Sequence, residues 1–545
     1  MTSTGADLLV RGLSDSGVPV VFGLPGVHNL AAWKALAGSG IRLVGVRHEQ
    51  TAVYAADGYA RATGSPGVAI TTTGPGAANT LGACGEAWAS GSPVVVIATD
   101  IPTTIRRPGV YRGSLHEATD QLAMFLPVTK DALRVGDASA LGDAVRWALD
   151  TALAPPSRPV YLEIPTDLLS AAAEGPAAAP EPRPLPFPSD DELARAAAIV
   201  SEASRPLIWA GGGALRSGAG DAVGALATRL AAPVITTHMA RGLLGSGHPC
   251  AVGFPPHLPE VGALWDDADA VLAIGSDLDG MMTQNWTMPR PRHLVTVNID
   301  PADAGKNYEP ELMLTGDARA VVEALAPLVP ERGGVDELAQ QLGSLRSVAR
   351  AALAAGEPAA IEFVDSFDAA VPADAVVVAD MCIPGYWLAA MHPVSAPRRL
   401  AYPMGWGTLG YGFPLAIGSA LAERGPVVCV CGDGGFLYAC GELATVAQER
   451  IPLTLVIVDD GGYGMLRFDQ RHSGDPTFGV DLLTPDFAAM AASFGVKSDT
   501  VDGLGPVFSE ALTRHVAIDA PTVLVARAAL DPPPTTSPRW YRRRT

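Results

Sequence analysis

Residues 426–464 of this chain read PVVCVCGDGGFLYACGELATVAQERIPLTLVIVDDGGYG. Two apolar runs, Val427–Cys431 and Leu453–Val458, have the length and composition of buried strands, and a helical pattern at Gly441–Arg450 separates them. Two strands joined through one helix form a right-handed parallel unit, so both strands end at the same edge of the sheet. The stretch therefore predicts an open α/β sheet, and such sheets bind ligands at the carboxyl edge.

Acidic residues and glycines follow both strands of this unit. Asp433 lies within Gly432–Gly435, and the second strand runs into Asp459-Asp460-Gly461-Gly462. Glycines let backbone N–H groups approach an anion, and oxygen ligands beside them suit Mg²⁺ or Ca²⁺. The pattern predicts a metal-held diphosphate, with an unliganded strand-end turn as the alternative.

This segment resembles the diphosphate-binding motif of the thiamine diphosphate (ThDP) enzymes, in which Gly-Asp-Gly is followed, one helix and one strand later, by Asn-Asn. Here Asp459-Asp460 stands where the family has the Asn pair, and Gly435 stands where serine is common. The resemblance implies that Asp433, the side chain of Asp460 and the carbonyl oxygen of Gly462 bind Mg²⁺. It also implies ThDP contacts from the remaining loop residues, which are Gly432, Gly434, Gly435, Tyr463 and Gly464.

A second motif lies near the start of the chain, where Glu49 follows a predicted strand at Ile41–Val46. A strand at Gly67–Thr71 and the turn Thr73-Gly74-Pro75-Gly76 come next. This order resembles the pyrimidine-binding domain of the same family, which implies that Gly74 contacts ThDP and that Glu49 bonds the aminopyrimidine ring. A carboxyl group there can share a proton with a ring nitrogen. Taken alone, Glu49 reads as a helix N-terminal carboxylate, and only the two motifs together favour the catalytic role.

A third match is the stretch 405–414, GWGTLGYGFP. It resembles the loop that supports the bent shape of bound ThDP, with Leu409 in the position of the bulky apolar side chain between the two rings. The alternative for Leu409 is an ordinary core leucine beside a glycine turn.

Two loops are predicted to carry histidines to the reacting atoms. His28 lies in a segment, residues 22–29, that resembles the first active-site loop of benzaldehyde lyase-like enzymes. His116 stands where related branches carry a catalytic glutamine. Two imidazoles could relay protons at neutral pH, whereas the alternative for each is a loop histidine bonded to backbone.

Substrate contacts are predicted from Gln121, Met465 and Arg467. Arg467 could hold a carboxylate with a bidentate contact, and a solvated helix arginine is its alternative. The tail 531–545, rich in proline and arginine, could close over the site or be a disordered terminus.

The whole chain has 545 residues, which is enough for about three domains. We expect a pyrimidine-binding domain at 1–168, a central domain at 190–330 and a diphosphate-binding domain at 360–530, with an extended Ala/Pro-rich linker at 171–188. All three should be doubly wound parallel sheets of the α/β class. The central glycines Gly211–Gly213 lack the full dinucleotide spacing, so FAD is the less favoured alternative to a purely structural domain.

Charge and composition exclude several classes of function. The net charge is −19 with a pI of about 4.9, which argues against nucleic-acid binding. The sequence has no apolar run of membrane-spanning length and no signal-peptide pattern at its start, and its six cysteines show no zinc spacing. We therefore expect a cytoplasmic protein with reduced cysteines.

The motifs together resemble the acetolactate synthase/benzaldehyde lyase-like group of ThDP enzymes. The resemblance implies a ThDP- and Mg²⁺-dependent enzyme that acts on a 2-oxo acid or acyloin, working as a homodimer or homotetramer. Decarboxylation with acetolactate synthase-like carboligation is the leading expectation. The alternatives are a decarboxylase that releases an aldehyde, a hydroxyacyl-CoA or acyloin lyase, and, least favoured, a ThDP-fold binding protein without activity.

Overall fold

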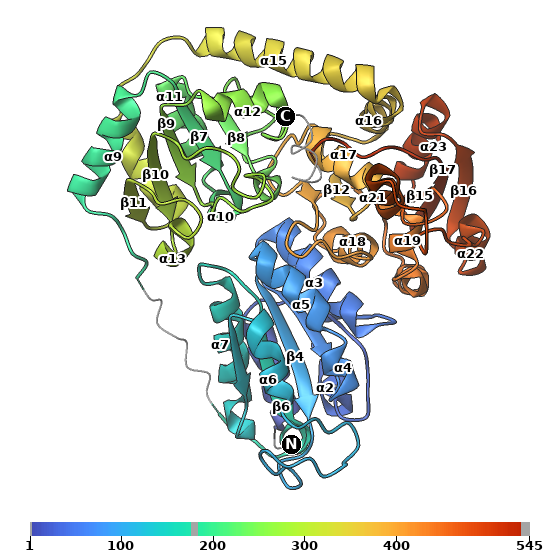
Figure 1. Ribbon diagram of the computed structural model, residues 1–545. Coiled ribbons are helices and arrows are strands. Elements are labelled where there is room, and N and C mark those ends of the chain that lie inside the picture. Colours follow the sequence, from blue (N-terminus) through green and yellow to red (C-terminus); the bar gives the residue numbers. More distant parts are fainter. Residues whose placement is uncertain (1–2, 176–183, 536–545) are drawn as a thin grey trace.

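The computed structural model describes residues 3–175 and 184–535, which fold around three sheets whose strands all pair in parallel (Figure 1). The first sheet lies in the blue-to-teal part of the ribbon, the second in the green part and the third in the orange-to-red part. Helices cover both faces of each sheet, as they must when parallel strands are connected by crossovers. The α/β class with three doubly wound sheets, expected from the sequence, is thus confirmed.

The first sheet has the strand order β2-β1-β3-β4-β6-β5. Its strands are β1 (Val20–Gly23), β2 (Arg42–Gly45), β3 (Gly67–Thr71), β4 (Val94–Asp100), β5 (Asp131–Arg134) and β6 (Val160–Pro165). Its helices are α1 (Gly5–Asp15), α2 (Leu30–Leu36), α3 (Glu49–Thr63), α4 (Pro75–Ala78), α5 (Leu81–Ser90), α6 (Gln121–Phe125), α7 (Leu141–Leu153) and α8 (Thr166–Ser170).

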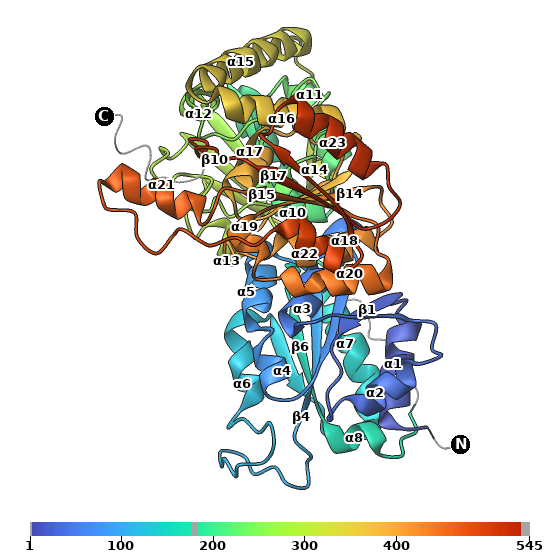
Figure 2. The ribbon, with the colours of Figure 1, turned by 90° about the vertical axis from the view of Figure 1, so that its right-hand side faces the viewer.

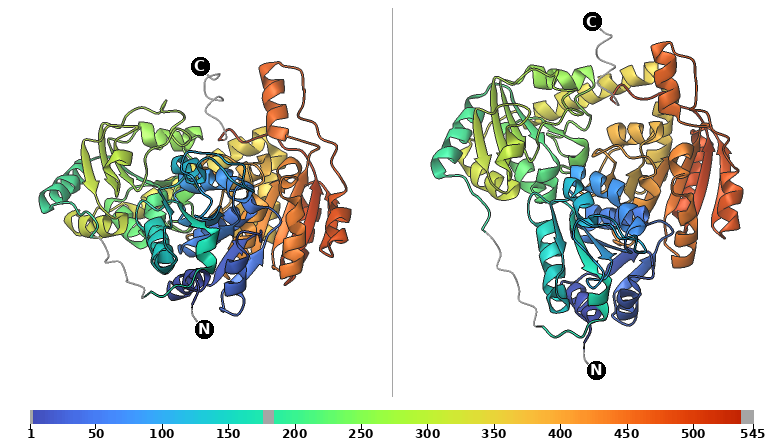
Figure 3. Two further views of the ribbon diagram at one scale, coloured as in Figure 1. Left: turned by 90° about the horizontal axis from the view of Figure 1, so that it is seen from below. Right: turned by 60° about the horizontal axis from the view of Figure 1, so that its bottom comes forward.

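The central sheet has the order β11-β10-β9-β7-β8. Its strands are β7 (Pro206–Ala210), β8 (Val234–Thr236), β9 (Ala270–Ile274), β10 (His293–Asn298) and β11 (Leu312–Thr315). Its helices are α9 (Asp190–Glu202), α10 (Gly212–Arg216), α11 (Gly220–Leu230), α12 (Pro259–Asp266), α13 (Pro301–Ala304) and α14 (Ala318–Leu325). The long helix α15 (Val335–Gly356) then crosses from this part of the molecule to the third sheet, as Figure 1 and the right view of Figure 3 show.

The third sheet has the order β13-β12-β14-β15-β17-β16. Its strands are β12 (Val376–Ala379), β13 (Leu400–Ala401), β14 (Val427–Gly432), β15 (Thr454–Asp459), β16 (Lys497–Asp502) and β17 (Thr522–Arg527). Its helices are α16 (Pro358–Ala370), α17 (Ile383–Met391), α18 (Gly412–Ala420), α19 (Asp433–Phe436), α20 (Leu443–Glu449), α21 (Gly464–Ser473), α22 (Phe487–Ser493) and α23 (Pro506–Val516).

The first and third sheets share one topology. Counted in chain order within each sheet, the strands of both run 2-1-3-4-6-5. Strands β14 and β15 pair in parallel with α20 between them, so the strand–helix–strand unit predicted from residues 426–464 is present, with boundaries one or two residues from the expected ones. Both strand ends therefore lie at the same edge of the sheet, where the glycine and aspartate loops follow.

Helices α3 and α18 cross between the first and third sheets, near the middle of the view in Figure 2. A Cβ atom on Gly58 would lie 2.0 Å from the carbonyl oxygen of Leu415, and one on Gly418 would lie 1.7 Å from that of Ala55. Only glycine permits backbones to approach this closely. The crossing also brings together the elements beside two residues singled out in the sequence, because α3 begins at Glu49 and α18 begins three residues after Leu409.

Two sequence expectations fall partly outside the described residues. Residues 176–183 of the expected linker and residues 536–545 of the tail lie outside them. Across the described residues, no helix combines the length and apolar character needed to cross a membrane.

Candidate active site

The loop after β14 places Asp433 at the start of α19, where it is 1% exposed. One carboxylate oxygen accepts the N–H of Gly434 at 2.7 Å, and the other accepts the N–H of Gly462 at 2.8 Å. Burial, together with the nearby Asp460, raises the pKa of Asp433 to about 7. The carboxylate therefore ties the loop after β14 to the loop after β15.

Asp460 follows β15 and faces the same loop. Its Oδ1 atom is buried and accepts no hydrogen bond in the described structure, while burial raises the pKa of its carboxyl group. A buried carboxylate oxygen without a partner is costly, and a cation would satisfy it. The nearest positive group is Arg467, whose Nη1 lies 3.8 Å from Oδ1.

Arg467 supports this loop from α21. It donates to the carbonyl oxygens of Asp460 and Gly461 at 3.1 and 3.0 Å, and its Nε donates to Asp481 at 2.8 Å. These bonds leave the guanidinium engaged with the loop backbone, rather than open toward a substrate.

A cavity of about 130 Å³ lies against both loops. Most of the diphosphate-side residues singled out in the sequence line it, namely Leu409, Gly432, Asp433, Gly434, Gly435, Asp460, Gly462, Tyr463, Gly464 and Met465. The remaining wall residues all lie between Met381 and Leu530. Among the described residues, none from the first or central sheet lines this cavity.

Glu49 occupies the first position of α3 and is 8% exposed. Its Oε2 accepts a hydrogen bond from Asn79 Nδ2 at 2.9 Å. A Cβ atom on Gly76 would lie 3.4 Å from Oε1, so the glycine turn leaves room next to the carboxylate. The glycine turn and Glu49, singled out together in the sequence, thus lie side by side, and Asn79 is a contact of Glu49 that was not predicted from the sequence.

The side chain of Gln121 supports the turn at Gly74. Gly74 has φ 66°, a value favoured by glycine, and a Cβ there would lie 2.4 Å from the carbonyl oxygen of His116. Gln121 accepts the Gly74 N–H at 2.6 Å, while its amide nitrogen bonds the Thr99 carbonyl, Tyr161 and Glu163. Gln121 is therefore a buried support of the turn.

His28 and His116 lie side by side, with 3.3 Å between their Nδ1 atoms. Burial and the neighbouring imidazole both lower the pKa of His28, so its neutral form is favoured. His116 has φ 65°, an uncommon backbone conformation for a residue with a side chain. The structure thus brings together two histidines that are distant in sequence.

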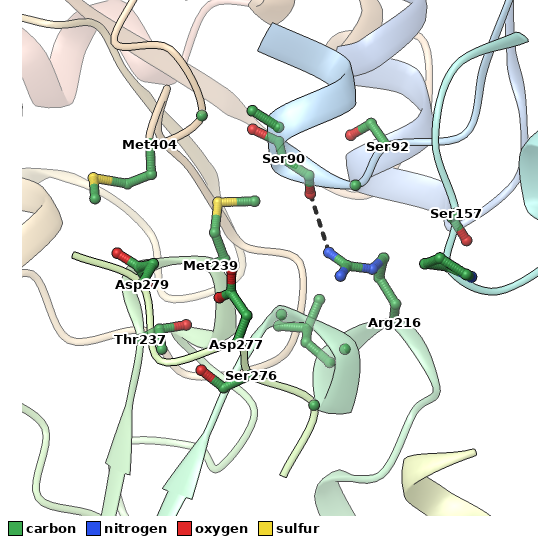
Figure 4. A pocket seen from close by; sticks show the side chains of 18 of the residues that line it. Ser90, Ser92, Ser157, Arg216, Thr237, Met239, Ser276, Asp277, Asp279 and Met404 are labelled. Atoms are coloured by element: carbon green, nitrogen blue, oxygen red, sulfur yellow. Dashed lines mark hydrogen bonds between the residues drawn. The ribbon is translucent and has the colours of Figure 1, made fainter. Parts of the chain in front are cut away.

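A larger cavity, about 790 Å³, lies where the three sheet regions meet. Figure 4 shows Arg216 reaching from α10 toward the end of α5, where it donates to the Ser90 carbonyl at 3.1 Å. Burial and neighbouring arginines lower the pKa of Arg216 to about 10. Gly211, which precedes α10, allows close backbone packing, because a Cβ atom there would lie 2.4 Å from the carbonyl oxygen of Gly275.

Three family models match the chain, one for each sheet region. The N-terminal thiamine pyrophosphate binding domain matches residues 3–124, the central domain of the same enzymes matches 193–325, and the C-terminal thiamine pyrophosphate binding domain matches 381–526. A probable 2-ketoarginine decarboxylase from Pseudomonas aeruginosa is 37% identical over 499 residues, which cover 91% of this chain and 89% of that one. The chain belongs to the thiamine pyrophosphate (ThDP) enzyme family.

The chain is also similar to acetolactate synthases and to a solved ThDP-dependent decarboxylase. The acetolactate synthase large subunit of Parasynechococcus marenigrum is 32% identical and covers 96% of this chain and 86% of its own. Isozyme 3 of that subunit in Escherichia coli is 30% identical, with 90% and 88% covered. A solved structure, the ThDP-dependent 4-hydroxybenzoylformate decarboxylase of Rhodococcus jostii RHA1, superposes with a TM-score of 0.83 at 24% identity, over 97% of this chain and 100% of that one. This last likeness concerns the fold.

Proposed function

We propose that this ThDP enzyme is a 2-oxo acid decarboxylase that uses ThDP and Mg²⁺. The observation that carries the proposal is the pair of carboxylates that line the small cavity, buried Asp433 and half-buried Asp460, of which Asp460 has a buried oxygen without a hydrogen-bond partner. The decarboxylase relative at 37% identity favours aldehyde release over acetolactate synthase-like carboligation, which was the leading expectation from the sequence. Decarboxylation transfers no net electrons, so the proposal includes no flavin.

The residues around the small cavity fit a diphosphate–metal group. Asp433, Asp460 and the carbonyl oxygen of Gly462 would hold Mg²⁺, a hard cation that prefers oxygen ligands. In the described residues no group of three or more His, Cys, Asp or Glu side chains could hold a metal, and this set needs only two carboxylates. When bound, ThDP would supply a nucleophilic thiazolium carbon that can bond the substrate carbonyl and a positively charged ring that can take up the electron pair left behind when CO₂ departs.

The protein's part is to place protons and to exclude water. Glu49 would hold a proton at its Oε atoms next to the pyrimidine ring, with Asn79 fixing its orientation. His28, whose pKa is lowered by burial and by the neighbouring His116, could accept or return a proton near the substrate, and His116 lies within hydrogen-bond distance of it. Leu409 and Met465 give the cavity apolar walls, which strengthens electrostatic contacts inside it.

The proposed site requires a second copy of the chain. The cavity is lined from Met381 onward, whereas Glu49 lies in the first sheet region. We propose that Glu49 of one subunit faces the cavity of another in a homodimer or a dimer of dimers. Sedimentation at micromolar concentration tests this, and a monomer that retains full activity would contradict it.

Calorimetric titration with ThDP and Mg²⁺ tests the cofactor assignment. CO₂ release from a panel of 2-oxo acids, including 2-ketoarginine and pyruvate, then tests the reaction. We expect aldehyde as the product without an added acceptor, whereas an acetolactate-like product would favour carboligation instead. Glu49→Gln should abolish exchange of the thiazolium C2 proton of bound ThDP with solvent, and unchanged exchange would refute the role of Glu49. Absence of ThDP binding would overturn the whole proposal.

A further inference from the structure

Two buried carboxylates bind backbone across the interface between the first and third sheet regions, in opposite directions. Glu86 on α5 is 0% exposed and Glu442, just before α20, is 1% exposed. Neither residue lines the small cavity. Carboxylates are buried this deeply only when they are well hydrogen-bonded, so their partners identify what they hold.

Glu86 holds the loop that leads to Leu409. Its Oε1 accepts the N–H of Gly405 at 3.0 Å, and its Oε2 accepts the N–H of Trp406 at 2.8 Å. The Arg61 guanidinium lies 3.5 Å from Oε1, so a positive charge faces this carboxylate. The first sheet region thereby fixes the loop of the third region three residues before the proposed cofactor contact, Leu409.

Asp380, in the third region, holds the same loop on the far side of Leu409. It is fully buried and accepts the N–H groups of Gly410, Tyr411 and Gly412 at 3.2 to 3.3 Å. Leu409 is thus the last of three residues, 407–409, that lie between two carboxylate-bound backbone segments. Its side chain meets the cavity from a loop that has been fixed at both ends.

Glu442 makes the reciprocal contact. Its Oε1 accepts the N–H groups of Arg47 and His48, both at 3.1 Å, and Thr445 donates to Oε2 at 2.6 Å. Arg47 and His48 directly precede Glu49. The third sheet region therefore fixes the backbone that orients the proposed proton-holding carboxylate of the first.

Charge-assisted bonds to backbone N–H groups are stronger and more directional than neutral ones. Removing the charge leaves a buried N–H group poorly paired, and a loop can then shift. We infer that Glu86 and Glu442 are positioning residues for catalysis, through which each sheet region sets the placement of the other region's cofactor-facing side chain, Leu409 or Glu49. This inference rests on the proposed function, since it assigns those two side chains to ThDP.

The hydrogen bonds from backbone N–H groups to Glu86 and Glu442 can be tested first without cofactor, by amide hydrogen exchange. Glu442→Gln should speed exchange in the peptide that contains Arg47 and His48, and Glu86→Gln should do so in residues 405–408. Two matched variants alter carboxylates that pair between sheet regions but do not bind these loops: Asp303→Asn, which lies 3.3 Å from Arg158, and Glu449→Gln, which lies 3.9 Å from Arg42. Exchange in the two loops should remain at the wild-type rate in both.

The catalytic consequence is tested with double-mutant cycles on the holoenzyme. Glu442→Gln should slow C2 proton exchange of bound ThDP by at least about tenfold with little change in ThDP affinity, because a small misplacement is costly. It should have no further effect in a Glu49→Gln background, and Glu86→Gln should likewise add nothing to Leu409→Ala in kcat.

The outcomes distinguish a failure of the proposed function from a failure of the positioning role of Glu86 and Glu442. Wild-type protein that binds no ThDP would overturn the proposed function. Wild-type protein that binds and exchanges normally, with glutamine variants indistinguishable from the Asp303 and Glu449 controls, would overturn this inference alone. If a glutamine variant fails to fold, Thr445→Val and Ser90→Ala replace it. These remove one hydroxyl bond from Glu442 and Glu86, at 2.6 and 2.9 Å, and should give the same pattern more weakly.

Discussion

Replacing Gly418 by alanine should separate the two helices that connect the proposed catalytic halves. The new Cβ would lie 1.7 Å from the carbonyl oxygen of Ala55, whereas an ordinary contact begins near 3.4 Å. The backbones must therefore move apart by about 1.7 Å, because the obstructing atom belongs to a helix backbone that cannot rotate away. Overpacking of this kind costs about 3 kcal/mol, against a gain of about 1 kcal/mol from alanine's helix propensity.

The expected result is a melting temperature at least about 5 °C lower and a fall in kcat of about a hundredfold, since α3 carries Glu49. Differential scanning calorimetry and CO₂ release measure the two effects. Gly343→Ala is the control, because a Cβ there meets only Arg346 at 3.9 Å within helix α15. If Gly418→Ala matched the wild type in both measurements, the close α3–α18 crossing could not be what positions the site.

Two further predictions concern Asp433, a proposed metal ligand, and the pair His28 and His116. Asp433→Ala should lower the ThDP affinity measured by calorimetry with Mg²⁺ to the value that wild-type protein shows with EDTA. Adding EDTA to the variant should then have no further effect. If the ThDP affinity of the variant still depended on Mg²⁺, Asp433 would not be a metal ligand. His116→Asn should raise the pKa of His28 toward its ordinary 6.5, because burial and the neighbouring imidazole both lower it. Activity that needs neutral His28 is lost as pH falls through that pKa, so the acid limb of the kcat/KM profile should move to higher pH, and a shift to lower pH would contradict the reasoning.

Much of the third sheet region could be predicted from sequence because its signals are local. The runs on either side of residues 441–450 have strand composition, and glycine next to aspartate at a strand end specifies a ligand-binding turn. The chemistry of the loops around Asp433 and Asp460 is set within a few residues, and both loops line one cavity.

The supports of the site could not be predicted in the same way. Glu86 and Glu442 sit in helical patterns where an acid ordinarily faces water, and only tertiary packing buries them against the backbone of another sheet region. Arg467 was expected near the substrate, whereas its N–H groups donate to the carbonyl oxygens of Asp460 and Gly461 in the loop after β15. Gln121 likewise supports the Gly74 turn. Long-range hydrogen bonds of this kind leave no periodic signal in a sequence.

The walls of the small cavity come only from the stretch between Met381 and Leu530, whereas Glu49 stands near the start of the chain. With the two-copy site proposed above, this division has a genetic consequence. Loss-of-function alleles of the gene would fall into two complementation groups, one affecting the Glu49 half and one affecting the Asp433 half. A cell that carries one allele of each group would assemble some dimers with one intact site, so two inactive alleles could together restore growth.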